Sequence, residues 1–469
     1  MLHYAHSTEG PESQWEPLRD HLRRVAIGEN GYPGARQFAD VFSCAEWGEL
    51  AGWWHDLGKY SDKFQRRIGA GDDATSLEVS ERVDHSTAGA KHAASLDPAG
   101  KILSYAIAGH HGGIPDMHGP GRGNLYHRLT HRDIDDWTAA PTEIVQRPLP
   151  TTLPLKRSGN PAPFTIAFRI RMLFSCLVDA DWLWTEYFYD PEVMRIRRRN
   201  QTVSIQALAD QLSRSMSRFE PEARVNKIRA EILQDCVDAS LHPPGFFSLH
   251  VPTGGGKTLS SLTFALRHAA RHGQQRVIYA IPLTSIIEQT AKTFADIFGQ
   301  EAVLEHHSGL NEQQLEFQTR TQRLATENFD APLIVTTNVQ ILESLFANKP
   351  SKCRKLHRFA NSVIIFDEAQ ALPVDLLRPT LAALRELVSN HGCTIVLCSA
   401  TQPAVARREA FDIGLERIEP MIADPRSLHE RLRRTTVEMI GSRNVDELAR
   451  DIGSHAQALA ILNSRRHAR

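Results

Sequence analysis

The stretch that decides the fold of the second half of this chain is Phe246-Phe247-Ser248-Leu249-His250-Val251, followed at once by Pro252-Thr253-Gly254-Gly255-Gly256-Lys257-Thr258. The apolar run has the length of a buried strand, and residues 259–270 have the pattern of a helix. Glycines between a strand and a helix let backbone amides turn inward around phosphate groups. The sequence therefore predicts a strand, a phosphate-binding loop and a helix, in that order.

Four more short apolar runs follow this loop, and helical stretches separate them. They are residues 277–281, 333–336, 363–366 and 394–398. Strands that alternate with helices form a parallel sheet covered on both faces. We therefore expect an α/β domain with a parallel sheet over residues 201–425.

Residue types at the ends of two of these strands predict an ATP site with Mg²⁺. Lys257 supplies a positive charge to the phosphates, and the Thr258 hydroxyl is placed to hold Mg²⁺. Asp367 and Glu368 close the strand 363–366, at the edge where ligands bind in such sheets. We expect Asp367 to hold the Mg²⁺ shell and Glu368 to orient and deprotonate the attacking water. The predicted nucleotide-binding residues are Thr253, Gly254, Gly255, Gly256, Lys257, Thr258 and Asp367.

The first 200 residues have a different, mostly helical pattern. Apolar periodicity predicts helices over residues 46–57, 101–111 and 167–187. Residues 112–163 are rich in glycine, proline and polar side chains, and we expect a flexible lid or insertion there. The sequence therefore predicts an all-α domain over residues 1–200.

Histidines and one aspartate in this half predict a metal site. The run His55-Asp56-Leu57-Gly58-Lys59 joins an aspartate to a histidine at a helix end, and other histidines stand where helices begin or end. Such a set can hold one or two ions that activate water beside a phosphodiester. Imidazole-rich ligation favours Mn, Fe, Co, Ni or Zn. The candidate ligands are His55, Asp56, His85, His110 and His111, with Asp56 as a catalytic residue and Lys59 on a substrate phosphate.

A last carboxylate is expected from the helix 167–187. Asp179 and Asp181 lie two residues apart, so they point in directions about 200° apart around a helix, and only one readily faces the metals. Asp181 shares an apolar stripe, where a carboxylate needs a cation or a strong partner. We favour Asp181 and keep Asp179 as the alternative. Other N-terminal histidines, His6 among them, are left as structural or surface residues.

Composition narrows the class of protein without naming it. The 469 residues are 41% hydrophobic and 23% charged, with a formal net charge of −1, so any grip on nucleic acid must come from local patches. The six cysteines form no C-x-x-C pair, and we expect reduced thiols in a cytoplasmic protein. No run approaches the roughly 18 apolar residues that span a bilayer, so no membrane contact is expected.

The motifs together resemble a known family. The first half resembles the HD phosphohydrolase superfamily, and the second resembles superfamily 2 helicases. An HD domain followed by such a helicase core is similar to the CRISPR-associated nuclease–helicases of type I interference systems. The segments that carry the match are residues 4–7, 15–21, 55–59, 84–89, 109–113, 178–182, 252–258 and 366–372, with Ser399-Ala400-Thr401 and the loops 281–284 and 336–338.

The resemblance implies one more metal ligand and a function. The first metal-binding histidine of that family falls on His21. The family is recruited by an RNA-guided CRISPR surveillance complex that has opened target DNA. Its HD site nicks the displaced strand, and its helicase pulls single-stranded DNA through in the 3′ to 5′ direction. We therefore expect antiviral defence as the process and single-stranded DNA as the substrate.

The chain departs from the family near its end. Residues 458–462 have the pattern of the opening strand of a second RecA-like domain, so residues 426–469 are expected to be the truncated start of that domain. ATP binds between two such domains in the family. ATP hydrolysis by this chain alone is therefore expected to be slow or undetectable.

Two other functions remain open from the sequence. The first is an HD-type nucleotide phosphohydrolase that ATP binding regulates, which would prefer mononucleotides to single-stranded DNA. The second is a catalytically silent fragment that binds DNA or a partner. The presence of every expected metal ligand argues against the silent fragment.

Overall fold

The computed structural model describes residues 2–69, 83–199, 203–218, 223–307, 319–400 and 405–461. The chain divides into two compact units, Met1–Pro425 and Arg426–Arg469. Within the first unit, residues 2–199 form a helical half and residues 203–425 contain a parallel sheet. We call these the helical half and the sheet half.

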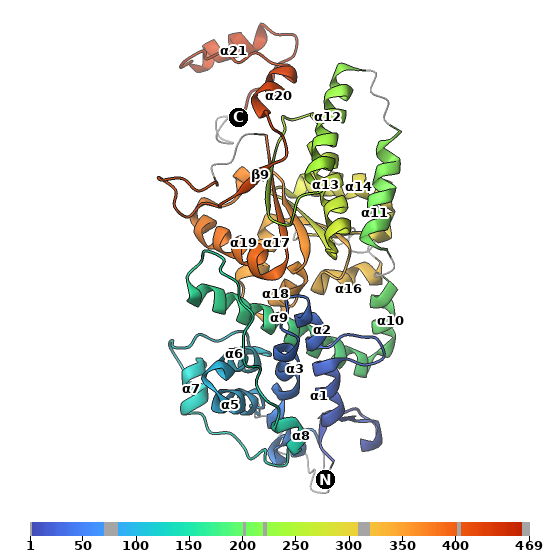
Figure 1. The fold of residues 1–469 in the computed structure, drawn as a ribbon, viewed down its shortest axis with the longest axis vertical. Helices are drawn as coiled ribbons and strands as arrows, with labels where there is room; N and C mark the ends of the chain where they lie inside the picture. The colour runs from blue at the N-terminus through green and yellow to red at the C-terminus, as the bar shows by residue number, and fades with distance from the viewer. Residues whose placement is uncertain are drawn as a thin grey trace. The chain divides into compact units, whose positions relative to one another are not determined.

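The helical half is built around one long helix. This helix, α9 (Ala162–Tyr189), packs against α1, α2, α3 and α6. The surrounding elements are β1 (Tyr4–His6), β2 (Glu16–Pro17), α1 (Leu18–Ile27), α2 (Ala35–Asp40), α3 (Ala45–Trp54), η2 (Leu57–Tyr60), α4 (Asp62–Arg67), α5 (Ser86–Leu96), α6 (Lys101–Gly109) and α10 (Pro191–Arg199). Figure 1 shows them in blue to green. An apolar face on almost every helix explains this packing, because each must bury that face against a neighbour.

The segment 112–163, expected as an insertion, is anchored to this core. It contains two short helices, α7 (Leu125–Thr130) and α8 (Thr142–Val145), and Leu125 and Ile144 are fully buried. The Trp54 indole donates a hydrogen bond to the Ile144 carbonyl at 2.9 Å, and the Trp47 indole donates to Thr152 at 3.1 Å. The segment therefore lies against α3 at these points.

Among its described residues, the sheet half has seven parallel strands in the order β5-β6-β4-β7-β8-β3-β9. Their bounds are β3 (Phe246–His250), β4 (Arg276–Ile281), β5 (Val303–His306), β6 (Leu333–Thr337), β7 (Ser362–Phe366), β8 (Thr394–Ser399) and β9 (Ile418–Pro420). Five of these are the predicted strands. The edge strands β5 and β9 were missed because each is short and lacks a continuous apolar run.

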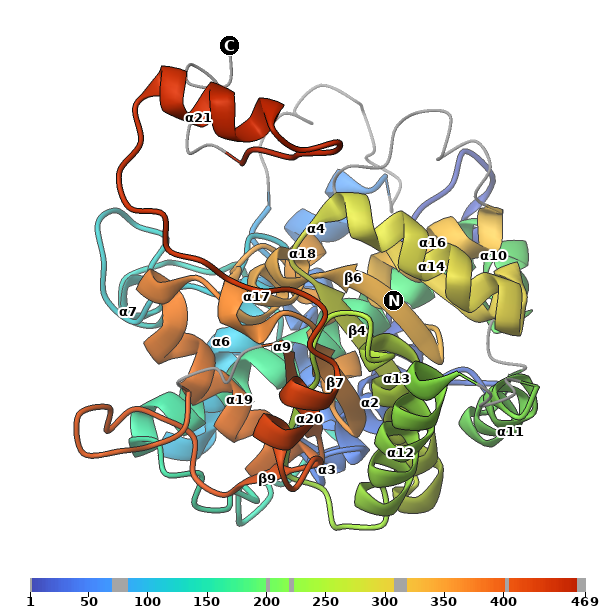
Figure 2. The ribbon, with the colours of Figure 1, turned by 90° about the horizontal axis from the view of Figure 1, so that it is seen from above.

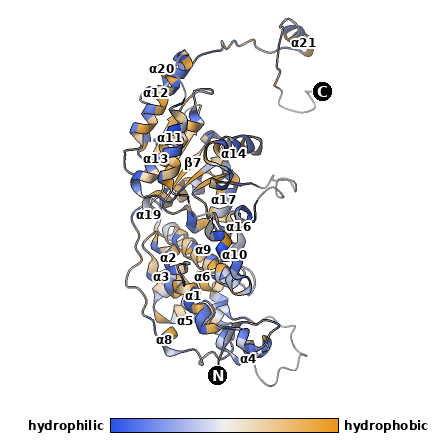
Figure 3. Ribbon diagram, turned by 90° about the vertical axis from the view of Figure 1, so that its right-hand side faces the viewer, coloured by the Kyte–Doolittle hydropathy of each residue, from blue (hydrophilic) through white to orange (hydrophobic). Residues whose placement is uncertain are grey.

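Helices cover both faces of the sheet, as an all-parallel sheet requires. Figure 2 shows α13 (Lys257–His272) and α14 (Thr284–Phe298) on one side, and α17 (Asn338–Phe346) and α19 (Leu377–His391) on the other. Hydrophobic residues concentrate on the strands between them (Figure 3). The other helices that the structure describes in this half are α11 (Ile205–Met216), α12 (Arg224–Ala239), α16 (Arg320–Asn328), α18 (Pro350–Cys353), η5 (Gln300–Ala302), η6 (Leu356–Phe359), η7 (Ala369–Ala371) and η8 (Val374–Leu376). The expected fold class, an all-α part followed by a parallel α/β part, is confirmed.

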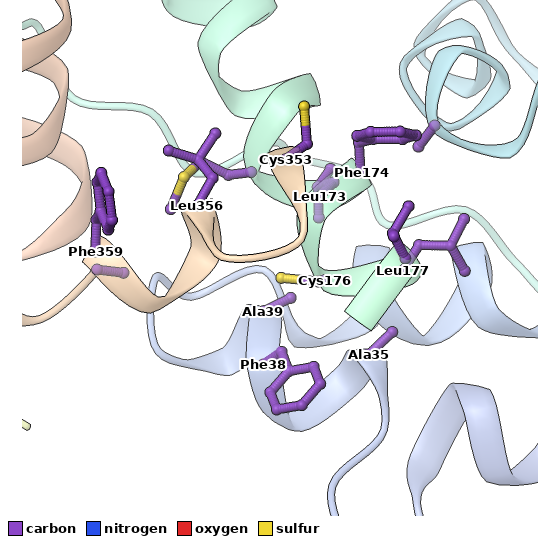
Figure 4. Close-up of a cluster of buried hydrophobic side chains, with 14 of the residues drawn as sticks. Ala35, Phe38, Ala39, Leu173, Phe174, Cys176, Leu177, Cys353, Leu356 and Phe359 are labelled. Atoms are coloured by element: carbon purple, nitrogen blue, oxygen red, sulfur yellow. The ribbon is translucent and has the colours of Figure 1, made fainter. Parts of the chain in front are cut away.

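The two halves share one hydrophobic core. Figure 4 shows Phe38 of α2, Leu173 and Leu177 of α9, and Leu356 and Phe359 of η6 in the same buried cluster. Polar groups join the halves as well, since Asp179 of α9 pairs with Arg354 at 2.7 Å. The helical and sheet halves are therefore fixed to each other by burial and by charge.

The second unit has no strand in its described residues. It contains most of α20 (Pro425–Arg431) and all of α21 (Val445–Gly453), which Asn444 and Glu447 cap reciprocally. Residues 458–461, expected to open a strand, are irregular, and Leu462 lies outside the described residues. Among the described helices of the whole chain, none combines the length and the apolar character needed to cross a bilayer.

Candidate metal centre and nucleotide site

The end of α3 places the first two candidate ligands. The helix ends at Trp54 and not at Leu57 as predicted, so His55 is its C-cap and Asp56 precedes the short helix η2. Gly58 then lies against the backbone of His85, where a Cβ atom would come within 2.4 Å of the His85 carbonyl oxygen. The Gly58 amide donates a hydrogen bond to that carbonyl at 3.1 Å. A glycine at this position therefore lets the start of α5 approach Asp56.

The other candidate ligands come from four further places in the helical half. His21 lies in α1, His85 is the N-cap of α5, and Asp181 lies in α9. His110 is the C-cap of α6, and His111 follows it. All of them surround Asp56, which is 1% exposed. The structure thus brings together every ligand predicted from the sequence.

One oxygen of Asp56 faces a first group of ligands. Asp56 Oδ2 lies 3.3 Å from His55 Nε2 and 3.8 Å from His21 Nε2. Asp181 Oδ1 completes this group, 3.4 Å from His21 Nε2 and 3.6 Å from His55 Nε2. We call Asp56, His21, His55 and Asp181 the inner cluster.

The other oxygen of Asp56 faces a second group. Asp56 Oδ1 lies 3.4 Å from His110 Nε2 and 3.5 Å from His85 Nε2. His111 Nε2 is 2.7 Å from His85 Nε2. We call Asp56, His85, His110 and His111 the outer cluster. The ligand atoms of the outer cluster all lie within 4.8 Å of one another, and the carboxylate of Asp56 belongs to both clusters.

The hydrogen bonds of the imidazoles fit metal ligation. His55 Nδ1 is 2.8 Å from the Gly52 carbonyl, and His110 Nδ1 is 2.7 Å from the Ile107 carbonyl. Each Nδ1 therefore donates its hydrogen to a carbonyl, which turns Nε2 toward the carboxylates as the nitrogen that would bind a cation in place of a proton. His55 Nε2, His110 Nε2, His21 Nε2 and Asp56 Oδ1 are buried without a hydrogen-bond partner among the described residues. Buried polar atoms that converge without partners fit one or two bound cations.

The pKa values in the two clusters point the same way. Burial opposes the charged form of His55, but Asp56 and Asp181 outweigh it and raise the pKa of His55 to about 10. Burial lowers the pKa of His85 to about 4, while His110 and burial lower the pKa of His111 to about 3. The carboxylates therefore favour positive charge beside them. His85 and His111 are neutral, and neutral imidazole is the form that binds metal.

Asp179 and Asp181 have different surroundings. Asp181 lies in the inner cluster, whereas Asp179 is fully buried and pairs with Arg354 across the two halves. The Asn328 amide also donates to Asp179, at 3.1 Å. The geometry thus supports Asp181 as the ligand and gives Asp179 a different role, which the sequence of α9 alone did not indicate.

Two residues near the metal ligands were not predicted to take part. Glu16 Oε2 lies 3.1 Å from His21 Nδ1 and 2.8 Å from His6 Nδ1, and Glu16 is 1% exposed. A carboxylate behind a ligand histidine fixes the ring and raises its basicity. His6, which is predicted above as a structural or surface residue, lies in this group. The signal in the sequence was weak, because Glu16 is separated from His21 by the start of α1.

Lys59 is buried beside the metal ligands. Its ammonium lies 2.7 Å from Asp56 Oδ2 and donates to the Ala5 carbonyl at 3.3 Å. Lys59 also lines a cavity of about 820 Å³ together with His111 and Asp181. Two of the candidate metal ligands and this lysine therefore face a space that is large enough for a substrate.

The predicted phosphate-binding loop lies between β3 and α13. Gly254 and Gly256 have φ angles of 84° and 85°, a conformation that other residues adopt only with strain. Lys257 is the first residue of α13 and pairs with Asp367 Oδ1 at 2.9 Å and with Glu368. The loop and the acidic pair thus meet at the carboxyl edge of the sheet, with β8 between their strands.

Other predicted helicase motifs are only partly described. Ser399 ends β8, next to His250 at the end of β3. Thr401 lies outside the described residues, as does the side chain of Thr284. Thr336 and Thr337 end β6, and Thr337 caps α17 by accepting a hydrogen bond from the Gln340 amide at 3.0 Å.

Comparisons with known proteins agree with the two halves. Residues 34–184 match the family model described as the HD domain of Cas3, and residues 227–408 match the model of DEAD/DEAH box helicases. The CRISPR-associated nuclease/helicase Cas3 of Haloferax volcanii is 27% identical over 233 residues, which cover 44% of this chain and 25% of that protein.

Two solved structures share the fold. The chain aligns with T. fusca Cas3 bound to AMPPNP at a TM-score of 0.55 and 18% identity, over 86% of this chain and 50% of that one. It aligns with a chain of a structure described as a CRISPR RNA-guided surveillance complex, pre-nicking, at a TM-score of 0.50 and 18% identity, over 86% and 48%. The chain thus spans about half the length of these solved relatives and a quarter of the curated one. With an HD domain of the Cas3 type followed by a DEAD/DEAH helicase domain, the chain is a homologue of the Cas3 nuclease/helicases.

Proposed function

We propose that this chain cleaves single-stranded DNA at the HD site in a metal-dependent reaction, as part of CRISPR antiviral defence. The observation that carries the proposal is Asp56, whose two carboxylate oxygens face separate groups of histidines. A bridging carboxylate between two such groups is the arrangement of two-metal phosphodiester hydrolases.

The residues of the site would divide the chemistry as follows. The inner cluster would hold one cation and the outer cluster a second, with Asp56 common to both. Bound divalent cations there supply an activated water and neutralise the charge that develops on the phosphate. Lys59 holds Asp56 in place from the cavity side and offers its ammonium to a phosphate oxygen. The burial of Asp56, His21 and His55 excludes bulk water from the inner cluster.

The donor set favours transition metals over Mg²⁺ at this site. Five imidazoles and two carboxylates converge, and imidazole suits Mn, Fe, Co, Ni or Zn. The helicase site has the opposite chemistry, because Thr258, Asp367 and the phosphates of ATP offer oxygen atoms, which suit Mg²⁺. We propose that binding of ATP with Mg²⁺ breaks the ion pairs of Lys257 with Asp367 and Glu368, because the lysine ammonium then pairs with the phosphates.

The helicase domain supports a role in moving the strand. We propose movement in the 3′ to 5′ direction, which is what the resemblance to the CRISPR-associated nuclease–helicases implies. We also propose that an RNA-guided surveillance complex recruits the protein. The likeness to a chain within a surveillance complex described as pre-nicking supports this partner.

The test is cleavage of circular single-stranded DNA with Mn²⁺ and without ATP. A circle has no ends, so any linear product reports an internal cut. We expect the wild-type chain to cut it and Asp56→Ala to lose at least about 100-fold in rate. Asp40→Ala removes an exposed carboxylate from the end of α2 and is the matched control, which should cut normally.

Two outcomes would count against the proposal. Hydrolysis of mononucleotides with no cutting of the circle would favour a nucleotide phosphohydrolase. A chain that binds no metal and does not cut the circle with Mn²⁺ would favour a catalytically silent DNA-binding protein.

A further inference from the structure

The cavity in front of the metal ligands has walls from both halves of the first unit. The helical half contributes Lys59, His111 and Asp181, and the sheet half contributes His306, Gln340, Lys352, Arg354 and Lys355. A substrate in this space therefore touches residues that the HD domain does not contain. A side chain of the sheet half can bind an anionic substrate only if its charge is not already paired within the protein.

The cationic side chains that line this cavity differ in whether they have carboxylate partners. Lys59 pairs with Asp56 at 2.7 Å, Lys352 with Glu343 at 2.8 Å, and Arg354 with Asp179 at 2.7 Å. Lys355 is 5% exposed, and within the described ranges of the chain no carboxylate lies within 4.0 Å of its ammonium. Among these four cations it is the one with no described carboxylate in direct contact, and Glu343 and Glu327 act on its charge only from beyond that distance.

The immediate contacts of Lys355 are uncharged. Its Nζ lies 3.1 Å from His306 Nε2 and 4.7 Å from the centre of the Phe329 ring. Burial and then Lys355 lower the pKa of His306 to about 3, so this imidazole is neutral. Burial lowers the pKa of Lys355 itself to about 8, which leaves the ammonium mostly protonated at neutral pH.

A buried ammonium without a counter-ion destabilises the fold unless an anion binds it. The backbone around Lys355 holds it rigidly, because it follows α18 and precedes η6, which packs against α9. The opposite wall has carboxylates and imidazoles that attract cations. A phosphodiester chain complements both walls, with one phosphate at the metal ligands and another at the ammonium.

We propose that Lys355 of the sheet half binds a backbone phosphate of the single strand whose neighbouring phosphodiester lies at the HD site. The substrate site of the nuclease is then composite, with the helicase domain holding the strand that the HD domain cuts. This inference rests on the proposed function, because it assumes a nucleic acid strand in the cavity.

The test compares Lys355→Met with Lys349→Met in the full chain. Methionine keeps most of the length of the side chain and removes the charge, and Lys349 is an exposed lysine outside the cavity lining. Binding of a fluorescent oligo-dT strand is measured by anisotropy in an Asp56→Asn background at several salt concentrations. Cleavage kinetics with Mn²⁺ are measured in the otherwise wild-type chain.

We expect Lys355→Met to raise Kd and KM about tenfold, the effect of losing one charge-assisted contact, with kcat changed by less than about twofold. The slope of log Kd against log salt should fall by about 0.7, the value for one phosphate contact on a single strand. The midpoint of thermal unfolding should stay or rise, because the uncompensated charge is gone. Lys349→Met should match the wild type in all five quantities.

An unchanged Kd and salt slope in Lys355→Met would overturn the proposal, and so would a lower unfolding midpoint with no change in the salt slope. If Lys355→Met does not fold, Lys355→Gln removes the charge and keeps a donor for His306. The binding measurement does not depend on cleavage. A chain that cuts no DNA therefore refutes the proposed function, while the anisotropy result still decides the role of Lys355.

Discussion

Among single residues, Asp56 has the most contacts with other candidate ligands. Its Oδ2 serves the inner cluster and its Oδ1 the outer cluster, while His55 and His110 are each fixed by a backbone carbonyl. The two clusters also have members of their own, Asp181 in one and His111 in the other. This division makes the number of bound ions testable.

Single substitutions should remove the ions selectively. We expect the wild-type chain to bind about two Mn²⁺ ions, and Asp181→Asn and His111→Gln each to bind about one. Asp56→Asn should bind neither tightly, because it belongs to both clusters. Equilibrium dialysis followed by elemental analysis measures the bound metal. Two ions retained in Asp56→Asn would contradict the bridging role.

A second residue, His391, makes the free energy of unfolding depend on pH. His391 is 1% exposed, and its Nε2 is without a hydrogen-bond partner among the described residues. Burial, followed by Arg169, lowers the pKa of His391 to about 3. The folded state therefore keeps this imidazole neutral, while the unfolded state protonates it below a pH of about 6.5.

Because the unfolded state binds the proton, stability should fall as the pH drops from about 6.5 toward 3. For His391 alone the loss from pH 6.5 to pH 5 is about 2 kcal/mol in the free energy of unfolding. Urea unfolding of the wild type and His391→Gln at both pH values measures it. The variant should lose about 2 kcal/mol less than the wild type over this interval, and equal losses would show that His391 does not titrate in this way.

At the scale of elements, α9 contributes residues both to the candidate metal site and to the junction of the two halves. Asp181 points to the inner cluster, while Asp179, two residues earlier, points to Arg354 and Asn328 in the sheet half. A helix turns about 100° per residue, so these two carboxylates face different partners. Next to them, Leu173 and Leu177 pack in the shared core that Figure 4 shows.

Loss of the Asp179 charge should therefore affect stability and not metal binding. We expect Asp179→Asn to lower the free energy of unfolding by about 3 kcal/mol, because it leaves the buried Arg354 with less compensation. Its Mn²⁺ binding should match the wild type. The control is Asp190→Asn, whose exposed pair with Arg320 should contribute less than about 1 kcal/mol. Weak metal binding in Asp179→Asn would show that the two carboxylates are not independent.

At the scale of the whole molecule, two sites with different chemistry lie in one unit. The candidate metal site consists of imidazoles and carboxylates, and the candidate nucleotide site consists of a lysine, a threonine and an acidic pair at the carboxyl edge of the sheet. Figure 1 shows the helices around α9 and the strands of the sheet half as separate parts of the fold. Each site should therefore lose its own ligand without affecting the other.

We expect Lys257→Ala to weaken ATP binding about 10–100-fold, from the loss of charge-assisted contacts to the phosphates, and to keep Mn²⁺-dependent cutting of single strands. Asp56→Ala should show the reverse pattern. Calorimetric titration with ATP and Mg²⁺ measures the first effect, and the circular DNA assay measures the second. Loss of both activities in Lys257→Ala would mean that nucleotide binding and cleavage are coupled even on an unwound strand.

The sequence by itself determined the order of the parts and most of the chemistry. Strand-length apolar runs and the loop 252–258 predicted the parallel sheet, because periodicity and glycine reflect local backbone geometry. His55, Asp56 and the pair His110-His111 were recognisable because ligand types stood together at helix ends.

Only the tertiary structure decided which distant residues meet. Asp179 against Arg354 and Lys355 in the wall of the cavity both depend on contacts between segments far apart in the chain. Such contacts leave no local pattern, since they are fixed by how helices and sheet pack. For the same reason the choice between Asp179 and Asp181 needed the packing of α9 against both halves. The sequence of a helix predicts which residues share a face, but it does not predict which segment packs against that face.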